Sequence, residues 1–303
     1  MRNNRLFNFV FSLINRKIYP SPAITRASFQ IVSKKITPYF FHTYKYGRIP
    51  ILLSFLSLGS KDDRATKRKN AITESDIIFA ADKFLEVCEL LSEFKHEDDV
   101  EILWRLARAL YKLSCEKDVK KTEKEKLVRE AYNFLERALE LDVNHFAVHK
   151  WMSVLLDARS ELDGIKVRIS NLEKVKQHML EAVKLNPKDA TTFYMLGSWC
   201  FQIANMPWYQ KQIASTIFAK PPESSFEEAL EYFRKAEEIQ PNFYNQNLFM
   251  LGQTYMKLGD KDEAKRFLTQ AVNYKVTTED DRKAKMDAEN LLKKLVEELF
   301  TSL

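Results

Sequence analysis

Apolar residues recur at intervals of three and four along most of the chain, which is the spacing of one face of an α-helix. The first clear stripe includes Ile77, Phe84 and Leu91 and ends at Phe94. Thr73 precedes it in a position to cap a helix, so the pattern predicts one helix from Thr73 to Phe94. Residues 61–72 are charged and lack the periodicity, and we predict a linker there.

A longer pattern is superimposed on the helical one. Residues 247–272 have small residues at Gly252, Ala264 and Ala271, interleaved with large ones, at the spacings of a tetratricopeptide repeat. Small residues are needed where two helices cross closely. Three more units of this kind precede it, over residues 103–143, 148–187 and 193–241. We therefore predict an all-α, tetratricopeptide-like, right-handed helical solenoid.

The spacing between units is irregular, because two units are longer than the standard 34 residues. The extra residues define insertions at 157–169 and 205–225. After Thr278 an apolar face is opposed by a charged one, which predicts a C-terminal capping helix. The helical domain would then span residues 73–299.

Composition excludes several classes of enzyme. Only six of 303 residues are glycine, and neither a G-x-G-x-x-G nor a P-loop motif occurs. The net charge of +6 comes from the N-terminus, because residues 1–61 hold ten Lys/Arg and no acid. Residues 62–303 hold the other 38 basic residues and all 42 acidic ones, so their net charge is −4. The body is mildly acidic, and we expect no nucleic-acid binding.

Residues 1–60 form a basic, acid-free segment in which Arg and Lys punctuate apolar clusters. This composition is typical of a mitochondrial targeting segment. A disordered basic tail, or an arm that binds acidic partners, is the alternative interpretation. The apolar run 49–58 is ten residues long, about half of what a membrane span needs, so we predict no transmembrane span.

A solenoid of helical hairpins exposes a concave groove lined by the first helix of each unit. Aromatic, cationic and amide side chains fall on the inward positions. The candidate binding residues are Trp104, Arg108, Tyr111, Lys112, His149, Tyr194, Phe201, Phe249, Gln253 and Met256. Such a groove suits a partner helix, an extended peptide, or a phospholipid whose head group lies near the two cations. Equally, an added helix from residues 76–93 or 205–225 could fill the groove and make these residues core.

No catalytic constellation is evident, and we expect no catalytic residue, metal or cofactor. His145 and His149 are four residues apart, but no third ligand follows at a fixed spacing. Such a pair is more typical of ordinary helix residues.

Three blocks within the third unit are more particular than a generic repeat: Trp199–Ala204, Pro207–Gln210 and Pro221–Leu230. In these blocks the chain resembles the regulator of microtubule dynamics family, and the resemblance extends over about residues 73–299. It implies a non-enzymatic protein associated with microtubules and tubulin, the mitotic spindle and its poles, and in some members mitochondria. The expected location is therefore mitochondrion, cytoplasm, cytoskeleton or spindle.

Two functional hypotheses follow. In the first, the protein binds a microtubule-associated partner through its groove or a basic surface. In the second, the same groove serves a mitochondrial lipid-binding or lipid-transfer domain.

Overall fold

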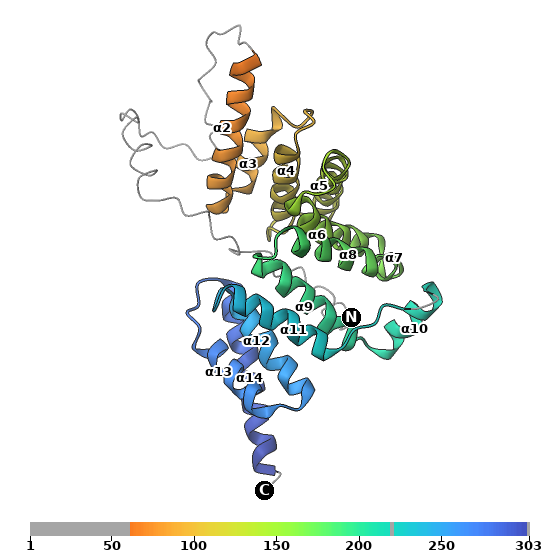
Figure 1. Cartoon of the computed structure of the whole chain (residues 1–303), viewed down its shortest axis with the longest axis vertical. Coiled ribbons are helices and arrows are strands. Elements are labelled where there is room, and N and C mark those ends of the chain that lie inside the picture. The colour runs from red at the N-terminus through yellow and green to blue at the C-terminus, as the bar shows by residue number, and fades with distance from the viewer. Residues whose placement is uncertain (1–60, 219–220, 302–303) are drawn as a thin grey trace.

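The computed structural model describes residues 61–218 and 221–301 (Figure 1). Within these ranges the chain forms thirteen α-helices and no strand, as the periodicity predicts. No helix of this part combines the length and the apolar character needed to cross a bilayer. The predictions made for residues 1–60 lie outside the described residues.

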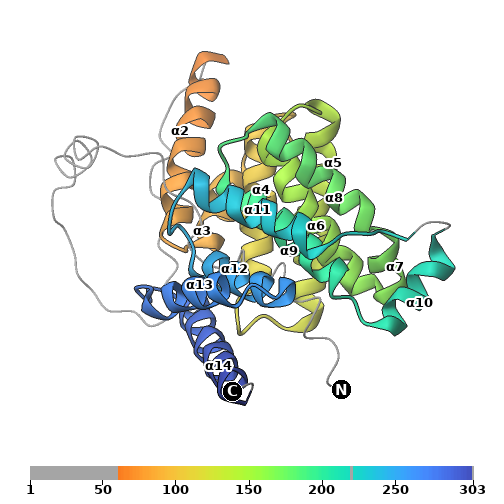
Figure 2. The same ribbon diagram turned by 60° about the horizontal axis from the view of Figure 1, so that its bottom comes forward.

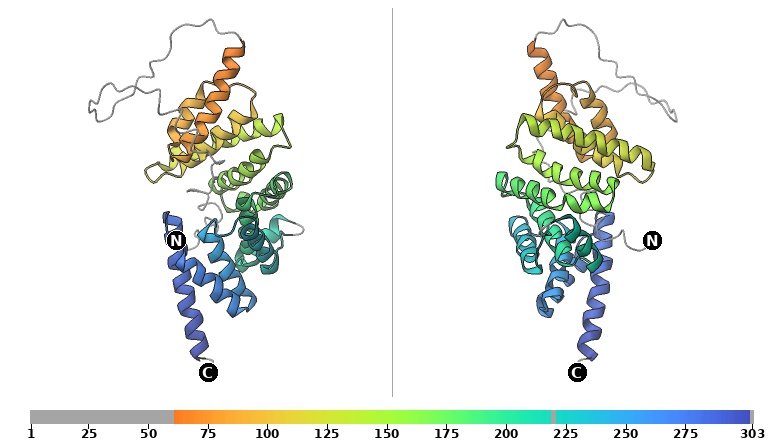
Figure 3. Two further views of the ribbon diagram at one scale, coloured as in Figure 1. Left: turned by 60° about the vertical axis from the view of Figure 1, so that its left-hand side comes forward. Right: turned by 90° about the vertical axis from the view of Figure 1, so that its right-hand side faces the viewer.

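Antiparallel helix pairs stack along the long axis of the molecule (Figures 1 and 3). The pair α2 (Lys61–Ala80) and α3 (Phe84–Ser92) lies at one end, and α14 (Glu279–Thr301) covers the other. The first helices of the four predicted units are α4 (Val100–Ser114), α6 (Phe146–Asp163), α9 (Ala190–Ala204) and α12 (Asn245–Leu258). Their second helices are α5 (Lys121–Leu141), α8 (Leu172–Leu185), α11 (Phe226–Ile239) and α13 (Lys261–Asn273). The predicted capping helix is α14 (Glu279–Thr301), which packs on α12 and α13.

Short polar side chains mark the starts of several helices. Asp99 accepts hydrogen bonds from the backbone of Glu101 and Ile102 at the start of α4. Asp189, Ser225 and Asp260 cap α9, α11 and α13 in the same way. Each cap satisfies a backbone N–H that the helix itself cannot, so the repeat boundaries are encoded locally.

The predicted small positions lie where helices cross. A Cβ placed on Gly252 would be 2.6 Å from Cγ and 3.1 Å from the backbone nitrogen of Leu268 in α13. A Cβ on Gly197 would be 2.7 Å from the ring of Phe233 in α11. The 2.6 and 2.7 Å distances are shorter than normal contacts, so the absence of a side chain sets how closely the two helices approach in the third and fourth units.

The N-terminal end differs from the prediction. Residues 61–72 are not an irregular linker: they form the first turns of α2 (Lys61–Ala80), and Thr73 lies inside that helix rather than capping it. Arg68 contacts Glu97 at 3.1 Å and Asp99 at 3.0 Å, and Ala71 is buried in the N-terminal apolar cluster, so charge pairs as well as apolar packing hold this part of α2. The single helix expected up to Phe94 is also divided, because Asp82 adopts a positive φ between α2 and α3 (Phe84–Ser92).

Each insertion contains a short helix, α7 (Ile165–Ser170) in the first and α10 (Trp208–Ile217) in the second. These two helices pack against each other at one edge of the molecule, although about forty residues of chain separate them (Figure 2). Gly164, with φ +104°, makes the turn into α7. Arg168 then reaches back to α6, where it forms a buried ion pair with Asp157.

Candidate functional site

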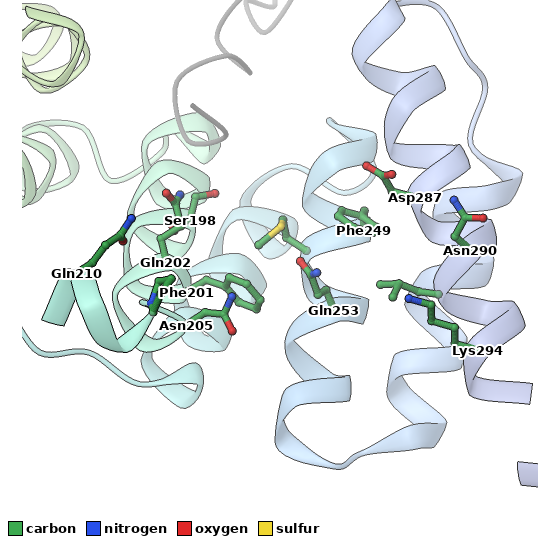
Figure 4. Close-up of a pocket in the computed structure, with 13 residues that line it drawn as sticks. Ser198, Phe201, Gln202, Asn205, Gln210, Phe249, Gln253, Asp287, Asn290 and Lys294 are labelled. Carbon is green, nitrogen blue, oxygen red and sulfur yellow. Dashed lines mark hydrogen bonds between the residues drawn. The ribbon is translucent and has the colours of Figure 1, made fainter. Parts of the chain in front are cut away.

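A pocket of about 450 Å³ opens between α9, α12 and α14 (Figure 4). It lies on the face formed by the first helices of the third and fourth units, which is where the repeat alignment places the groove. Phe201, Phe249, Met250 and Leu291 contribute its apolar walls. Phe201 makes an edge-on contact with Phe226 at 5.2 Å between ring centroids.

Five side-chain amides line the same pocket: Gln202, Asn205, Gln210, Gln253 and Asn290. Gln210 is the most informative, because only 3% of it is exposed. Its Nε2 donates to the Tyr209 hydroxyl at 3.3 Å, but its Oε1 is buried without a hydrogen-bond partner. A buried acceptor without a partner costs free energy. The pocket therefore carries primary amides that can both donate and accept, whereas Gln210 Oε1 itself is shielded from solvent.

Opposite charges lie on the α14 side of the pocket. Partial burial raises the pKa of Asp287, and the nearby Lys283 opposes that rise. Lys294, two turns further along α14, is exposed. One carboxyl and one ammonium group give the pocket no strong net charge, so a peptide main chain suits it better than a highly charged ligand.

The structure brings together three of the ten predicted groove residues, Phe201, Phe249 and Gln253, in this pocket. Met256 is half-buried one turn beyond Gln253 on α12 and packs against the core without lining the pocket.

At the other end of the groove, α2 covers the predicted positions. The Arg108 guanidinium lies 3.9 Å from the centroid of the Phe79 ring and 4.6 Å from that of Trp104, and it pairs with Asp76. Both Trp104 and Arg108 are buried. At this end, therefore, an added helix fills the groove and makes the predicted binding residues part of the core.

The central candidates are buried as well. Tyr111 packs against Trp151, and the Tyr194 ring meets Tyr244 edge-on at 5.2 Å. Lys112 is 5% exposed, and burial lowers its pKa to about 7.

The two neighbouring histidines face different partners. His145 Nε2 lies 3.0 Å from a Glu101 oxygen, whereas His149 Nδ1 lies 3.0 Å from Nδ1 of His178 on α8. His149 therefore lies between the two helices of its own hairpin. Among the described residues no group of three or more His, Cys, Asp or Glu side chains is placed to hold a metal ion.

Sequence reasoning missed the pocket residues outside the first helices. Asp287, Asn290 and Lys294 belong to α14, which we predicted only as a cap. Their spacing of three and four places them on one stripe beside the apolar face, and this signal was available in the sequence. Asn205 and Gln210 belong to the second insertion, whose path no repeat pattern predicts.

Comparisons with known proteins agree with this architecture. A family model described as Regulator of microtubule dynamics protein 1-3 matches residues 71–296. Regulator of microtubule dynamics protein 1 of Mus musculus is 41% identical over 226 residues, which are 75% of this chain and 74% of that protein. Regulator of microtubule dynamics protein 3 of Xenopus laevis is 32% identical over 209 residues, 69% of this chain and 45% of that protein.

Among solved structures, a thermophilic TPR protein of Thermus thermophilus superimposes with a TM-score of 0.50 at 16% identity, covering 73% of this chain and 98% of that one. This likeness supports the tetratricopeptide-like fold. The family model spans well over half of the chain, and the chain therefore belongs to the regulator of microtubule dynamics family.

Proposed function

We propose that this protein is a non-enzymatic adaptor that acts with microtubules and binds an extended segment of a protein partner in the pocket between α9, α12 and α14. The microtubule role rests on the names of its relatives. The observation that supports the pocket is its lining, which combines five side-chain amides with apolar walls.

A peptide main chain matches this lining chemically. Each peptide unit carries one N–H donor and one C=O acceptor, and a primary amide can pair with both. The apolar walls would take alternate side chains of the segment.

Co-sedimentation of the full chain with microtubules polymerised from purified tubulin tests this proposal. Gln253→Arg places a long cation in the pocket mouth and should weaken binding. Gln270→Arg, an exposed position on α13, introduces the same charge away from the pocket and should leave binding unchanged. Equal binding by both variants would refute a role for the pocket.

The basic segment 1–60 could also attract acidic surfaces, and salt separates the two contributions. Binding through exposed charges falls steeply between low and physiological ionic strength, whereas a contact built on amides and apolar walls is less sensitive. The difference between the two Gln variants should therefore persist at 0.15 M salt. Imaging the full chain against one that lacks residues 1–60 tests the predicted mitochondrial and spindle locations.

A second candidate function is the binding of a phospholipid acyl chain in the same pocket. The pocket volume lies within the range of known small-ligand sites, about 300–1,000 Å³, and its apolar walls favour this reading. Native mass spectrometry of the purified full chain should then show co-purified lipid that Gln253→Arg removes. Lipid-free protein would contradict this candidate and leave the peptide proposal standing.

A further inference from the structure

The two insertions build a surface that the repeats do not need. We call it the insertion edge, and it consists of the exposed apolar and basic residues of α7 and α10, two helices that pack on each other (Figure 2): Ile165, Lys166, Val167, Trp208 and Lys211. The side chains opposite these residues are buried. Ile169 is inaccessible to solvent, and Ala214 is 1% exposed. The core thus anchors both helices, and their outer apolar side chains are held outward.

Trp208 is the outstanding residue of this edge. It is 78% exposed, whereas Trp104, Trp151 and Trp199 are all buried. Ile165 and Val167 on the neighbouring helix are 44% and 37% exposed. Apolar residues that lie close together on a surface mark an interaction site more often than isolated ones do.

The charge on the edge has one sign. Neither α7 nor α10 contains an acidic residue, and each carries an exposed lysine. Two acids at the end of α6 have cationic partners. Asp163 lies 2.6 Å from Arg129, and Glu161 lies 3.8 Å from Arg168. The two lysines therefore give α7 and α10 a net positive charge, although Glu223 lines a neighbouring pocket together with Lys211.

We propose that the insertion edge docks on the surface of an anionic lipid bilayer, with Trp208 at head-group depth and Lys166 and Lys211 facing lipid phosphates. Tryptophan favours this depth because its ring is apolar and its N–H stays near water. Exposed lysines beside it add attraction to an anionic surface. This contact lies outside the pocket of the proposed function and does not depend on it.

Depth-dependent fluorescence quenching tests the contact on the full chain. Vesicles of phosphatidylcholine with 30% phosphatidylserine, in which the phosphatidylcholine is brominated, quench only tryptophans that reach the bilayer. All four tryptophans lie between residues 104 and 208, so binding through residues 1–60 alone would not be quenched. Trp208→Phe should abolish the quenching. Protein that co-sediments with the vesicles while its emission stays unquenched would overturn the proposal.

Charge variants test the role of the lysines. The double substitution Lys166→Gln with Lys211→Gln should raise the lipid concentration for half-maximal quenching roughly 30-fold, from the typical contribution of a basic residue at an anionic surface. Lys124→Gln with Lys265→Gln removes the same charge from exposed positions on α5 and α13 and serves as the control. Vesicles without phosphatidylserine should give little quenching. Equal shifts for the two double variants would contradict the assignment.

Discussion

The contact between His149 and His178 makes the stability of the protein depend on pH. His149 Nε2 lies 2.7 Å from the Val143 carbonyl oxygen, which can only accept a hydrogen bond. The proton of neutral His149 is therefore on Nε2, and its Nδ1 must accept from Nδ1 of His178, 3.0 Å away. A second proton on His149 would leave the Nδ1–H groups of His149 and His178 pointing at each other. A second proton on His178 would place a cation in a largely buried site.

Burial and the neighbouring His149 lower the pKa of His178 from 6.5 to about 4. In the unfolded chain the same imidazole titrates at its ordinary value. Between these two pKa values the unfolded chain binds more protons than the folded one, so the free energy of unfolding falls as the pH is lowered. For this one group the loss amounts to about 2 kcal/mol between pH 8 and pH 5.

Urea denaturation at pH 8 and pH 5 measures this loss. Gln at position 178 can still donate to His149 Nδ1 but does not titrate, so His178→Gln should remove about 2 kcal/mol of the pH dependence. His96→Gln, at an exposed position, is the matched control and should leave the pH dependence unchanged. If His178→Gln lost as much stability in acid as the wild type does, the assignment of protons in this pair would be wrong.

Two further predictions concern packing and buried charge. Gly252→Val should destabilise the fold by roughly 1–3 kcal/mol, despite valine's better helix propensity, because the new side chain overlaps Leu268. Urea denaturation should show that the same substitution costs less free energy of unfolding in a Leu268→Ala background. Equal costs in the two backgrounds would contradict this packing. Asp157→Ala leaves Arg168 buried without its carboxylate and should cost about 3–5 kcal/mol. The double substitution Asp157→Leu with Arg168→Met replaces both partners by apolar side chains and should recover much of that loss in the same assay. A double variant as unstable as Asp157→Ala would refute the reasoning.

The sequence by itself determined the repeat units. Their signals are local. An Asp or Ser cap marks the start of a helix, and a glycine in one helix of a hairpin allows the other helix to cross it closely. The two helices of a hairpin also follow each other directly in the chain. Gly252 and Ala264 could be placed because they lie on consecutive helices that a short connection joins. The capping helix after Thr278 was predictable for the same reason, since its apolar face is complete within one segment.

Only the tertiary structure decided which part of the groove is open. Asp76 meets Arg108, and Asn290 reaches the pocket of Phe201, because superhelical stacking brings residues far apart in sequence onto one face. The periodicity of a single helix records which side is apolar, and it does not record which other segment will cover that side. The meeting of α7 with α10 depends in the same way on how the second and third units stack, and no local pattern carries that information.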